Sequence, residues 1–208
     1  MAPILYSFRR CPYAMRARMA ITISKTPVRL REILLRDKPD AMLEASEKGT
    51  VPVVIEDDRV IDESIDVMHW ALSNNDPEGW LANSTDPLVK ECDEKFKHHL
   101  DRYKYATRYD DIDPEDHRTA GFAFLLKLEA VLEDQPYLCG EHRSFSDIAI
   151  FPFVRQFRIA DMAWFDASDI PNVQRWLTNL MTSALFTDVM KKYPLWKDTG
   201  EEFAFPEG

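Results

Sequence analysis

The sequence contains few cysteines and glycines and no long apolar run. Its 208 residues include three cysteines and six glycines. An odd number of widely spaced cysteines does not make the disulfide framework of a small secreted domain. No apolar stretch at the start is long enough for a signal peptide or a membrane span, so we expect a cytoplasmic protein without a membrane partner. In a reducing compartment, each cysteine is either inert packing or a reactive thiol.

The sequence also lacks a net positive charge. Its formal net charge of -10 argues against general nucleic-acid binding, because that binding requires Lys and Arg to neutralise phosphates. The charge is uneven, since residues 1–38 hold nine Lys and Arg against two Asp and Glu. This segment is predicted to attract a small anionic ligand; the alternative is a chance cluster on a solvated helix face.

The first 74 residues alternate between strand and helix patterns. Each segment is an apolar or periodic run, and turn residues separate one segment from the next. The expected strands are residues 4–8, 28–33, 51–55 and 60–61, and the expected helices are residues 12–25, 38–47 and 64–72. The order is βαβ followed by ββα, with the last two strands forming an antiparallel hairpin.

Turn residues are concentrated in residues 75–87, which we interpret as a linker between two domains. After this linker, apolar residues recur every three or four positions, as on one face of a helix. No alternating strand pattern follows residue 61. The sequence therefore predicts an α/β domain at residues 1–74 and an all-helical domain at residues 88–208.

Cys11 is the cysteine with a suggestive setting. Pro12 suits the first position of a helix, which makes Cys11 the N-cap, where the positive helix end stabilises a thiolate. Ala14 stands where a dithiol motif would have its second cysteine, so the thiolate needs an external thiol to release a mixed disulfide. The alternative is a small buried hydrophobe. Cys92 and Cys139 are expected to be structural.

Four short motifs resemble those of glutathione transferases. They are Phe8-Arg9-Arg10-Cys11-Pro12-Tyr13-Ala14-Met15-Arg16, Lys38-Pro39, Val51-Pro52-Val53 and Asp62-Glu63-Ser64. The omega class, which has a catalytic cysteine, is the most similar. The resemblance implies a thioredoxin-like α/β N-terminal domain, an all-α C-terminal domain and a homodimer.

The same resemblance implies roles for individual residues. Cys11 would be catalytic and would form a mixed disulfide with glutathione, the cosubstrate. Glu63 and Ser64 would bind the γ-glutamyl end, although helix capping is an alternative for both. The full set of implied glutathione-binding residues is Tyr13, Lys38, Val51, Pro52, Glu63 and Ser64.

Three features of the helical half complete the expectations. Ser144 and Asp147 resemble the family's structural capping box. His98 and His99 are adjacent and should diverge on a helix, so we expect a surface position and no metal. By resemblance, a second-substrate pocket lies between the domains; its candidates include Tyr103 and Phe122 and, above all, Tyr105, Arg108, Tyr109 and Trp164.

The sequence favours a glutathione-dependent transferase with thiol transferase or reductase chemistry on an unknown electrophile or disulfide. One alternative is a non-catalytic binding or regulatory protein of this fold, similar to its stringent-starvation or ion-channel relatives. A narrower alternative is a glutathionyl-hydroquinone reductase, although such enzymes tend to have tryptophan at the position of Tyr13.

Overall fold

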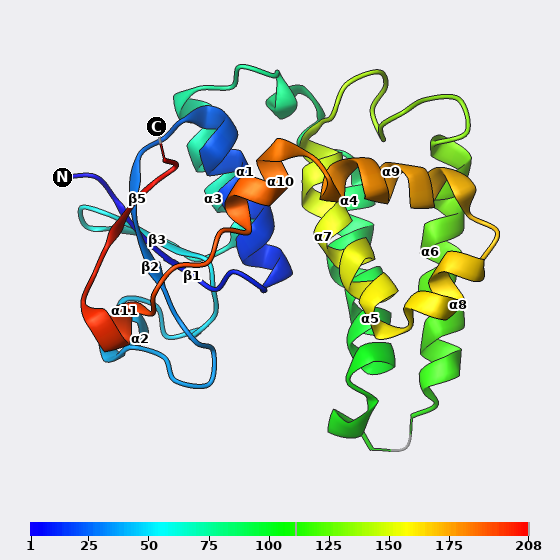
Figure 1. The fold of residues 1–208 in the computed structure, drawn as a ribbon, viewed down its shortest axis with the longest axis horizontal. Helices are drawn as coiled ribbons and strands as arrows, with labels where there is room; N and C mark the ends of the chain where they lie inside the picture. Colours follow the sequence, from blue (N-terminus) through cyan, green and yellow to red (C-terminus); the bar gives the residue numbers. More distant parts are fainter. Residues whose placement is uncertain (111, 208) are drawn as a thin grey trace. The chain divides into compact units, whose positions relative to one another are not determined.

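The computed structural model describes residues 1–110 and 112–207 and divides into two compact units (Figure 1). The first unit combines Met1–Leu81 with Ser183–Gly208, and the second is Ala82–Thr182. Within the described residues, each helix is too short or too polar to cross a membrane.

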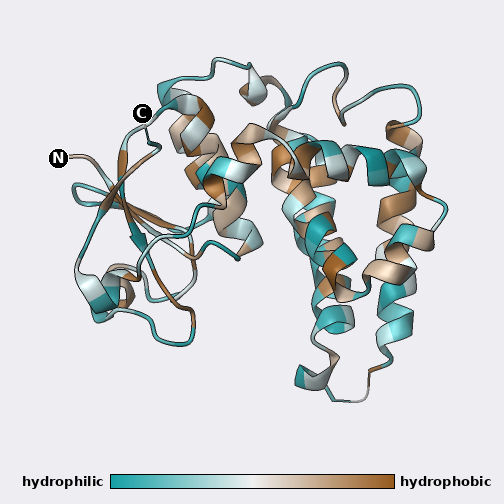
Figure 2. Cartoon of the chain, in the orientation of Figure 1, coloured by the Kyte–Doolittle hydropathy of each residue, from teal (hydrophilic) through white to brown (hydrophobic). Residues whose placement is uncertain are grey.

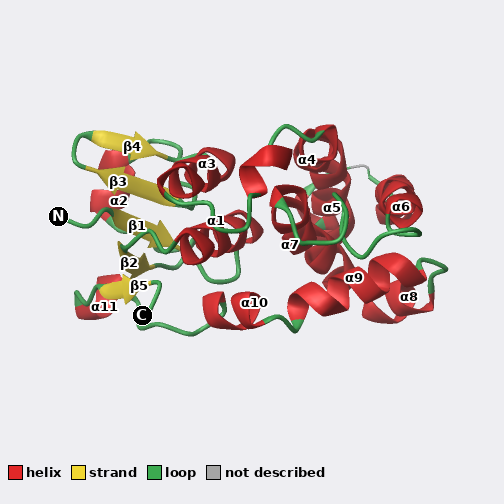
Figure 3. Cartoon of the chain, turned by 90° about the horizontal axis from the view of Figure 1, so that it is seen from above, coloured by secondary structure: helices red, strands yellow, loops and turns green. Residues whose placement is uncertain are grey.

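A five-stranded sheet forms the centre of the first unit. Its strands are β1 (Ile4–Ser7), β2 (Val28–Glu32), β3 (Val53–Glu56), β4 (Arg59–Ile61) and β5 (Phe203–Phe205). They lie in the order β4-β3-β1-β2-β5, as Figure 3 shows. β1 and β2 are parallel and the other neighbours are antiparallel, including the expected β3–β4 hairpin. The adjacent strands β1 and β3 are mostly apolar (Figure 2).

Two helices, α1 (Pro12–Ser24) and α3 (Ser64–Asn74), lie side by side on one face of this sheet (Figures 1 and 3). A third helix, α10 (Ala184–Val189), packs against α1. α1 is buried on nearly all sides, which explains its run of Ala, Met and Ile residues. The unit also contains α2 (Asp40–Ala45) and α11 (Trp196–Thr199).

The C-terminal residues correct the prediction of an all-helical stretch from 88 to 208. Ser183–Gly208 belongs to the first unit, and β5 extends the sheet by pairing Phe203 with Leu30 and Phe205 with Val28. A three-residue strand is too short to show an alternating pattern. Its partner strand is also far away in the sequence. The sequence pattern therefore does not indicate β5, whose pairing with β2 is seen only in the folded chain.

The named elements of the second unit are helices in the residues that the structure describes. Its helices are η1 (Trp80–Asn83, shared with the first unit), α4 (Pro87–Glu91), η2 (Cys92–Phe96), α5 (Lys97–Lys104), η3 (Ala106–Arg108), α6 (Pro114–Val131), α7 (Phe145–Ala160), α8 (Met162–Ala167) and α9 (Pro171–Met181). Phe96 stacks on Phe124 and contacts Phe157, with ring centroids 4.8 and 5.4 Å apart. These aromatic contacts join η2, α6 and α7 in one core.

α7 begins with a capping box. Asp147 accepts hydrogen bonds from the backbone N–H of Ser144 at 2.8 Å and from its hydroxyl at 2.6 Å, while the Ser144 hydroxyl accepts the N–H of Asp147. The other carboxylate oxygen accepts the N–H of Leu138 at 2.9 Å and the indole N–H of Trp176 at 2.8 Å. Asp147 is fully buried, and this burial raises its pKa. One carboxylate thus joins a loop, α7 and α9.

Candidate functional site

Cys11 is the N-cap residue of α1. Its backbone is extended (φ -77°, ψ 124°), its N–H donates to the Phe8 carbonyl at 2.9 Å, and its carbonyl accepts from Met15 N–H at 2.9 Å. Pro12 occupies the start of the helix, and Cys11 is half-buried. The turn after β1 thus holds the thiol at the positive end of a 13-residue helix.

The loop before β3 lies against this thiol. Cys11 Sγ is 3.7 Å from the Val51 carbonyl oxygen, and the Val51–Pro52 peptide bond is cis. Val51 is buried in a small apolar cluster with Tyr6, Ala14, Ile33, Met42 and Val53, against which Cys11 packs. The structure therefore brings together two motifs that are forty residues apart in the sequence.

Ser64, at the start of α3, is joined to α1 by a buried arginine. Arg16 Nε donates to Ser64 Oγ at 2.9 Å, and the guanidinium lies 5.1 Å from the centre of the Tyr13 ring. The side chain of Arg16 is only 2% exposed. Arg16 thus connects two of the expected glutathione-binding residues. Sequence reasoning treated it only as nearby positive charge, because periodicity does not show which arginines are buried.

Glu63 is the N-cap residue of α3, but its side chain makes no capping hydrogen bond. It accepts a hydrogen bond from Lys48 Nζ at 2.7 Å instead, so side-chain capping by Glu63 is wrong. Lys48 also donates to Asp62 at 2.9 Å. The two carboxylates raise the pKa of Lys48, and Lys48 lowers the pKa of Asp62. The sequence did not single out Lys48, because its partners follow it by 14 and 15 residues.

Lys38 lies beside the loop that leads to Val51. It is half-buried, and a Cβ added at Gly49 would lie 3.5 Å from its Nζ. Gly49 has φ +58°, a conformation that suits glycine. The loop therefore approaches the Lys38 side chain closely.

Three arginines of the basic N-terminal segment form ion pairs within their own unit. Arg29 and Arg31 form ion pairs with Glu202 at 2.8 and 2.5 Å. Arg18 is fully buried 3.3 Å from Glu32, and burial lowers the pKa of Arg18 and raises that of Glu32.

Arg10 is the exposed arginine next to the thiol residue. It lies 5.2 Å from the centre of the Phe8 ring. A cavity of about 370 Å³ opens beside this turn. Its lining residues are Phe8, Arg9, Arg10, Glu32, Ile33, Leu34, Lys192, Tyr193, Pro194 and Leu195. The C-terminal segment thus covers one side of the surface that precedes Cys11.

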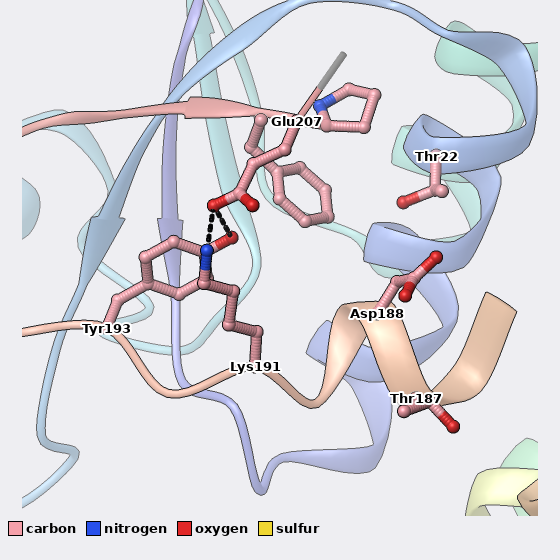
Figure 4. A pocket seen from close by; sticks show the side chains of 8 residues that line it. Thr22, Thr187, Asp188, Lys191, Tyr193 and Glu207 are labelled. Atoms are coloured by element: carbon pink, nitrogen blue, oxygen red, sulfur yellow. Dashed lines mark hydrogen bonds and ion pairs between the residues drawn. The ribbon is translucent and has the colours of Figure 1, made fainter. Parts of the chain in front are cut away.

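A second cavity, of about 340 Å³, lies where α1, α10 and the C-terminal segment meet (Figure 4). The Glu207 carboxylate reaches across it to the hydroxyl of Tyr193 at 3.2 Å and to Lys191 Nζ. Burial and the Glu207 charge raise the pKa of Tyr193 to about 12. The expected site residues do not line this cavity.

The second-substrate candidates lie in the second unit. Arg108 lies over the Tyr105 ring at 4.3 Å, and the Tyr105 hydroxyl accepts a hydrogen bond from Gln156. The guanidinium of Arg102 lies 4.5 Å from the centre of the Tyr109 ring. Trp164 contacts Phe122 and Phe157 instead. The structure therefore brings together Arg108 with Tyr105, and Trp164 with Phe122.

The histidines correct another expectation. His98 and His99 do not diverge; both rings lie close to His117 on α6, and all three offer ligand atoms within 4.8 Å of one another. Sequence spacing did not reveal His117, which is 18 residues beyond His99.

The remaining cysteines differ in setting from Cys11. Cys92 is fully buried in the helical core. Cys139 is exposed in a turn and lies 3.5 Å from the Ser146 hydroxyl, and desolvation raises the pKa of its thiol. Neither residue is an N-cap of one of the described helices.

Two family profiles match most of the chain. Residues 5–79 match the N-terminal domain of glutathione S-transferases, and residues 86–179 match the C-terminal domain. The chain therefore belongs to the glutathione S-transferase superfamily. The predicted architecture, a thioredoxin-like α/β domain with an all-helical domain, is confirmed.

Individual relatives are distant. Glutaredoxin 2 of Escherichia coli is 31% identical over 42% of this chain, and the match covers 40% of that protein. "Glutathione S-transferase DHAR3, chloroplastic" of Arabidopsis thaliana is 24% identical over 86% of this chain and 68% of that protein.

Solved structures share the fold at lower identity. A glutathione transferase family member from Pseudomonas fluorescens, solved with two glutathione bound, has a TM-score of 0.77 at 15% identity over 90% of this chain and 92% of that chain. A glutathione transferase from Burkholderia graminis, with two glutathione molecules per subunit, also has a TM-score of 0.77, at 18% identity over 90% of this chain and 87% of that chain.

Proposed function

We propose that this protein is a glutathione-dependent thiol transferase or reductase that works through Cys11. The observation that carries the proposal is the position of the Cys11 thiol, at the N-cap of α1 and 3.7 Å from the Val51 carbonyl before a cis proline. A helix N-terminus supplies positive potential to a thiolate, which is the nucleophilic form. The glutaredoxin and glutathione S-transferase names of the relatives support this chemistry.

The reaction needs two thiol exchanges. The Cys11 thiolate attacks the glutathionyl sulfur of a mixed disulfide, a new S–S bond forms, and the substrate thiolate leaves with the electron pair of the broken bond. A second glutathione thiolate then attacks the Cys11 mixed disulfide, which yields glutathione disulfide and restores the Cys11 thiolate. The two electrons that reduce the substrate therefore come from glutathione.

The residues around Cys11 suit glutathione. The Val51 backbone would pair with the cysteinyl part, and the start of α3 at Ser64 would suit the γ-glutamyl carboxylate. Lys38 and Tyr13 complete the proposed set. Glu63 would meet the γ-glutamyl ammonium, although that ammonium has to compete with Lys48, which already contacts the carboxylate.

Intact-mass analysis after incubation with glutathione disulfide tests this function. We expect one glutathionyl adduct that reductant removes and that Cys11→Ser abolishes. Cys139→Ser is the matched control, because Cys139 is exposed but lies in a turn; it should keep the adduct. If Cys11→Ser retains the adduct, or if Cys11→Ser leaves glutathione-dependent disulfide reduction unchanged, the assignment is wrong.

The finer expectations belong to this proposal. They are the omega-like class, a homodimer and a cytoplasmic location, where the reducing environment maintains thiols. Light scattering of the purified chain tests the dimer. A binding protein without catalysis is distinguished by the absence of turnover, and a hydroquinone reductase by faster turnover of a glutathionylated hydroquinone than of a simple mixed disulfide.

A further inference from the structure

Three histidines form a cluster between two helices of the second unit. His98 and His99 lie on α5, and His117 lies in the first turns of α6. The Nδ1 atoms of His99 and His117 are 2.9 Å apart. Ring centroids are 5.1 Å apart for His98–His99, 5.8 Å for His98–His117 and 5.1 Å for His99–His117. The cluster is therefore a triangle of imidazoles rather than one stacked pair.

The packing of α5 against α6 explains why neighbouring residues converge. Successive helical side chains point about 100° apart, so His98 and His99 normally serve different faces. Here α5 packs against α6, and the rings of both His98 and His99 lie close to His117 of α6, which closes the triangle. His98 is exposed and the other two rings are half-buried, so the cluster is open to solvent on one side.

Two short contacts constrain the ring nitrogens of the cluster. Arg102 Nη1 lies 3.0 Å from His98 Nδ1, so that nitrogen accepts. The close His99–His117 contact requires one ring to donate and the other to accept.

We propose that His98, His99 and His117 bind one divalent first-row transition metal ion, such as Zn²⁺, through one imidazole nitrogen each. Imidazole is a favoured ligand of such ions, whereas Mg²⁺ and Ca²⁺ select oxygen. A tetrahedral ion with Zn–N bonds of about 2.0 Å separates its ligand nitrogens by about 3.3 Å. The three ligand atoms lie within 4.8 Å of one another, so small ring rotations complete the site. Water occupies the remaining position.

The binding of Zn²⁺ tests the proposal on the full-length chain. Cysteine thiols are first blocked with iodoacetamide, so that they do not bind the ion, and Zn²⁺ is then titrated by calorimetry. We expect one ion per chain, with a Kd at or below about 10 μM. His117→Gln and, separately, His99→Gln should each weaken binding by at least about 10-fold, because each removes a ligand. Zn²⁺ should also raise the Tm of the wild type but not of these variants.

His142→Gln is the matched control, because His142 lies outside the cluster; it should bind Zn²⁺ like the wild type. Circular dichroism establishes that each variant is folded. The proposal is overturned if the wild type binds no Zn²⁺ with a Kd below about 1 mM, or if the folded His117→Gln variant binds as tightly as the wild type. Neither outcome bears on Cys11, whose reactions are measured separately.

Discussion

Replacing Asp147 with alanine should strongly destabilise the protein. The substitution removes the acceptor of four buried donors, namely the N–H of Leu138, the N–H and the hydroxyl of Ser144, and the indole N–H of Trp176. Each such donor costs about 1–3 kcal/mol, and relief from burying a carboxylate offsets part of the total. We therefore expect Asp147→Ala to lower the free energy of unfolding by about 3–5 kcal/mol.

Urea denaturation followed by far-UV circular dichroism measures this loss. Asp147→Asn keeps one oxygen for Leu138 and Trp176 but turns an NH₂ group toward the Ser144 N–H, so we expect a smaller loss of about 1–3 kcal/mol. Ser144→Ala removes a capping hydroxyl and should cost about 1 kcal/mol. Ser144 and Asp147 share direct hydrogen bonds, so the loss of unfolding free energy in a variant with both substitutions should differ from the sum of the two single losses.

The pH dependence follows from the direction of the pKa shift. Burial raises the pKa of Asp147 above its ordinary 3.8. The stability that this raised pKa adds is therefore complete below about pH 4, and it is lost as the pH rises through the folded-state pKa. The stability difference between the wild type and Asp147→Asn should therefore shrink as the pH rises from about 4.

Asp166→Ala is the surface control. Asp166 is 48% exposed and pairs with Arg158 at 2.6 Å, so its loss should cost less than about 1 kcal/mol. The account of Asp147 as a buried junction is refuted if Asp147→Ala costs less than about 1 kcal/mol, or if it costs no more than Asp166→Ala.

Three further outcomes are expected. Gly121→Ala should destabilise the protein by about 1–3 kcal/mol despite the better helix propensity of alanine, because the new Cβ would lie 2.7 Å from the buried Phe157 ring; thermal unfolding measures this, and a higher Tm would contradict it. The pKa of Tyr193 is raised to about 12, so the wild type should lose stability relative to Tyr193→Phe between about pH 10 and 12, as urea titrations at each pH can show; a constant difference would count against the shift. Deleting residues 201–208 removes β5, including the buried Phe205, and should cost at least about 3 kcal/mol in urea denaturation; an unchanged midpoint would mean that the strand contributes little.

The local elements that carry Cys11 could be predicted from the sequence. The apolar run before Arg9 and the proline after Cys11 indicate a strand, a turn and a helix start by chemistry that acts within a few residues. The structure has β1 and α1 within one residue of the predicted ends. Local signals of this kind are strong because a proline restricts the backbone by itself, and a short apolar run of strand-forming residues followed by polar ones is typical of a strand.

Contacts between distant segments were harder to predict. The burial of Arg16 against Ser64 depends on how α1 packs beside α3, and an arginine in an apolar helix gives no sign of that partner. The meeting of His117 with His98 and His99 depends on the register of α5 against α6. Side-chain direction across an interface is set by packing, which spacing along one segment does not encode.

The pairing of β5 with β2 makes the first unit discontinuous in the chain. A ribosome synthesises residues 1–81, then the whole helical unit, and only then α10 and β5. Until that point, one edge of the sheet and one side of α1 lack the partners that cover them in the finished structure. Uncovered strand edges favour association with other chains. The unit that carries Cys11 is therefore the first to begin folding and the last to be completed.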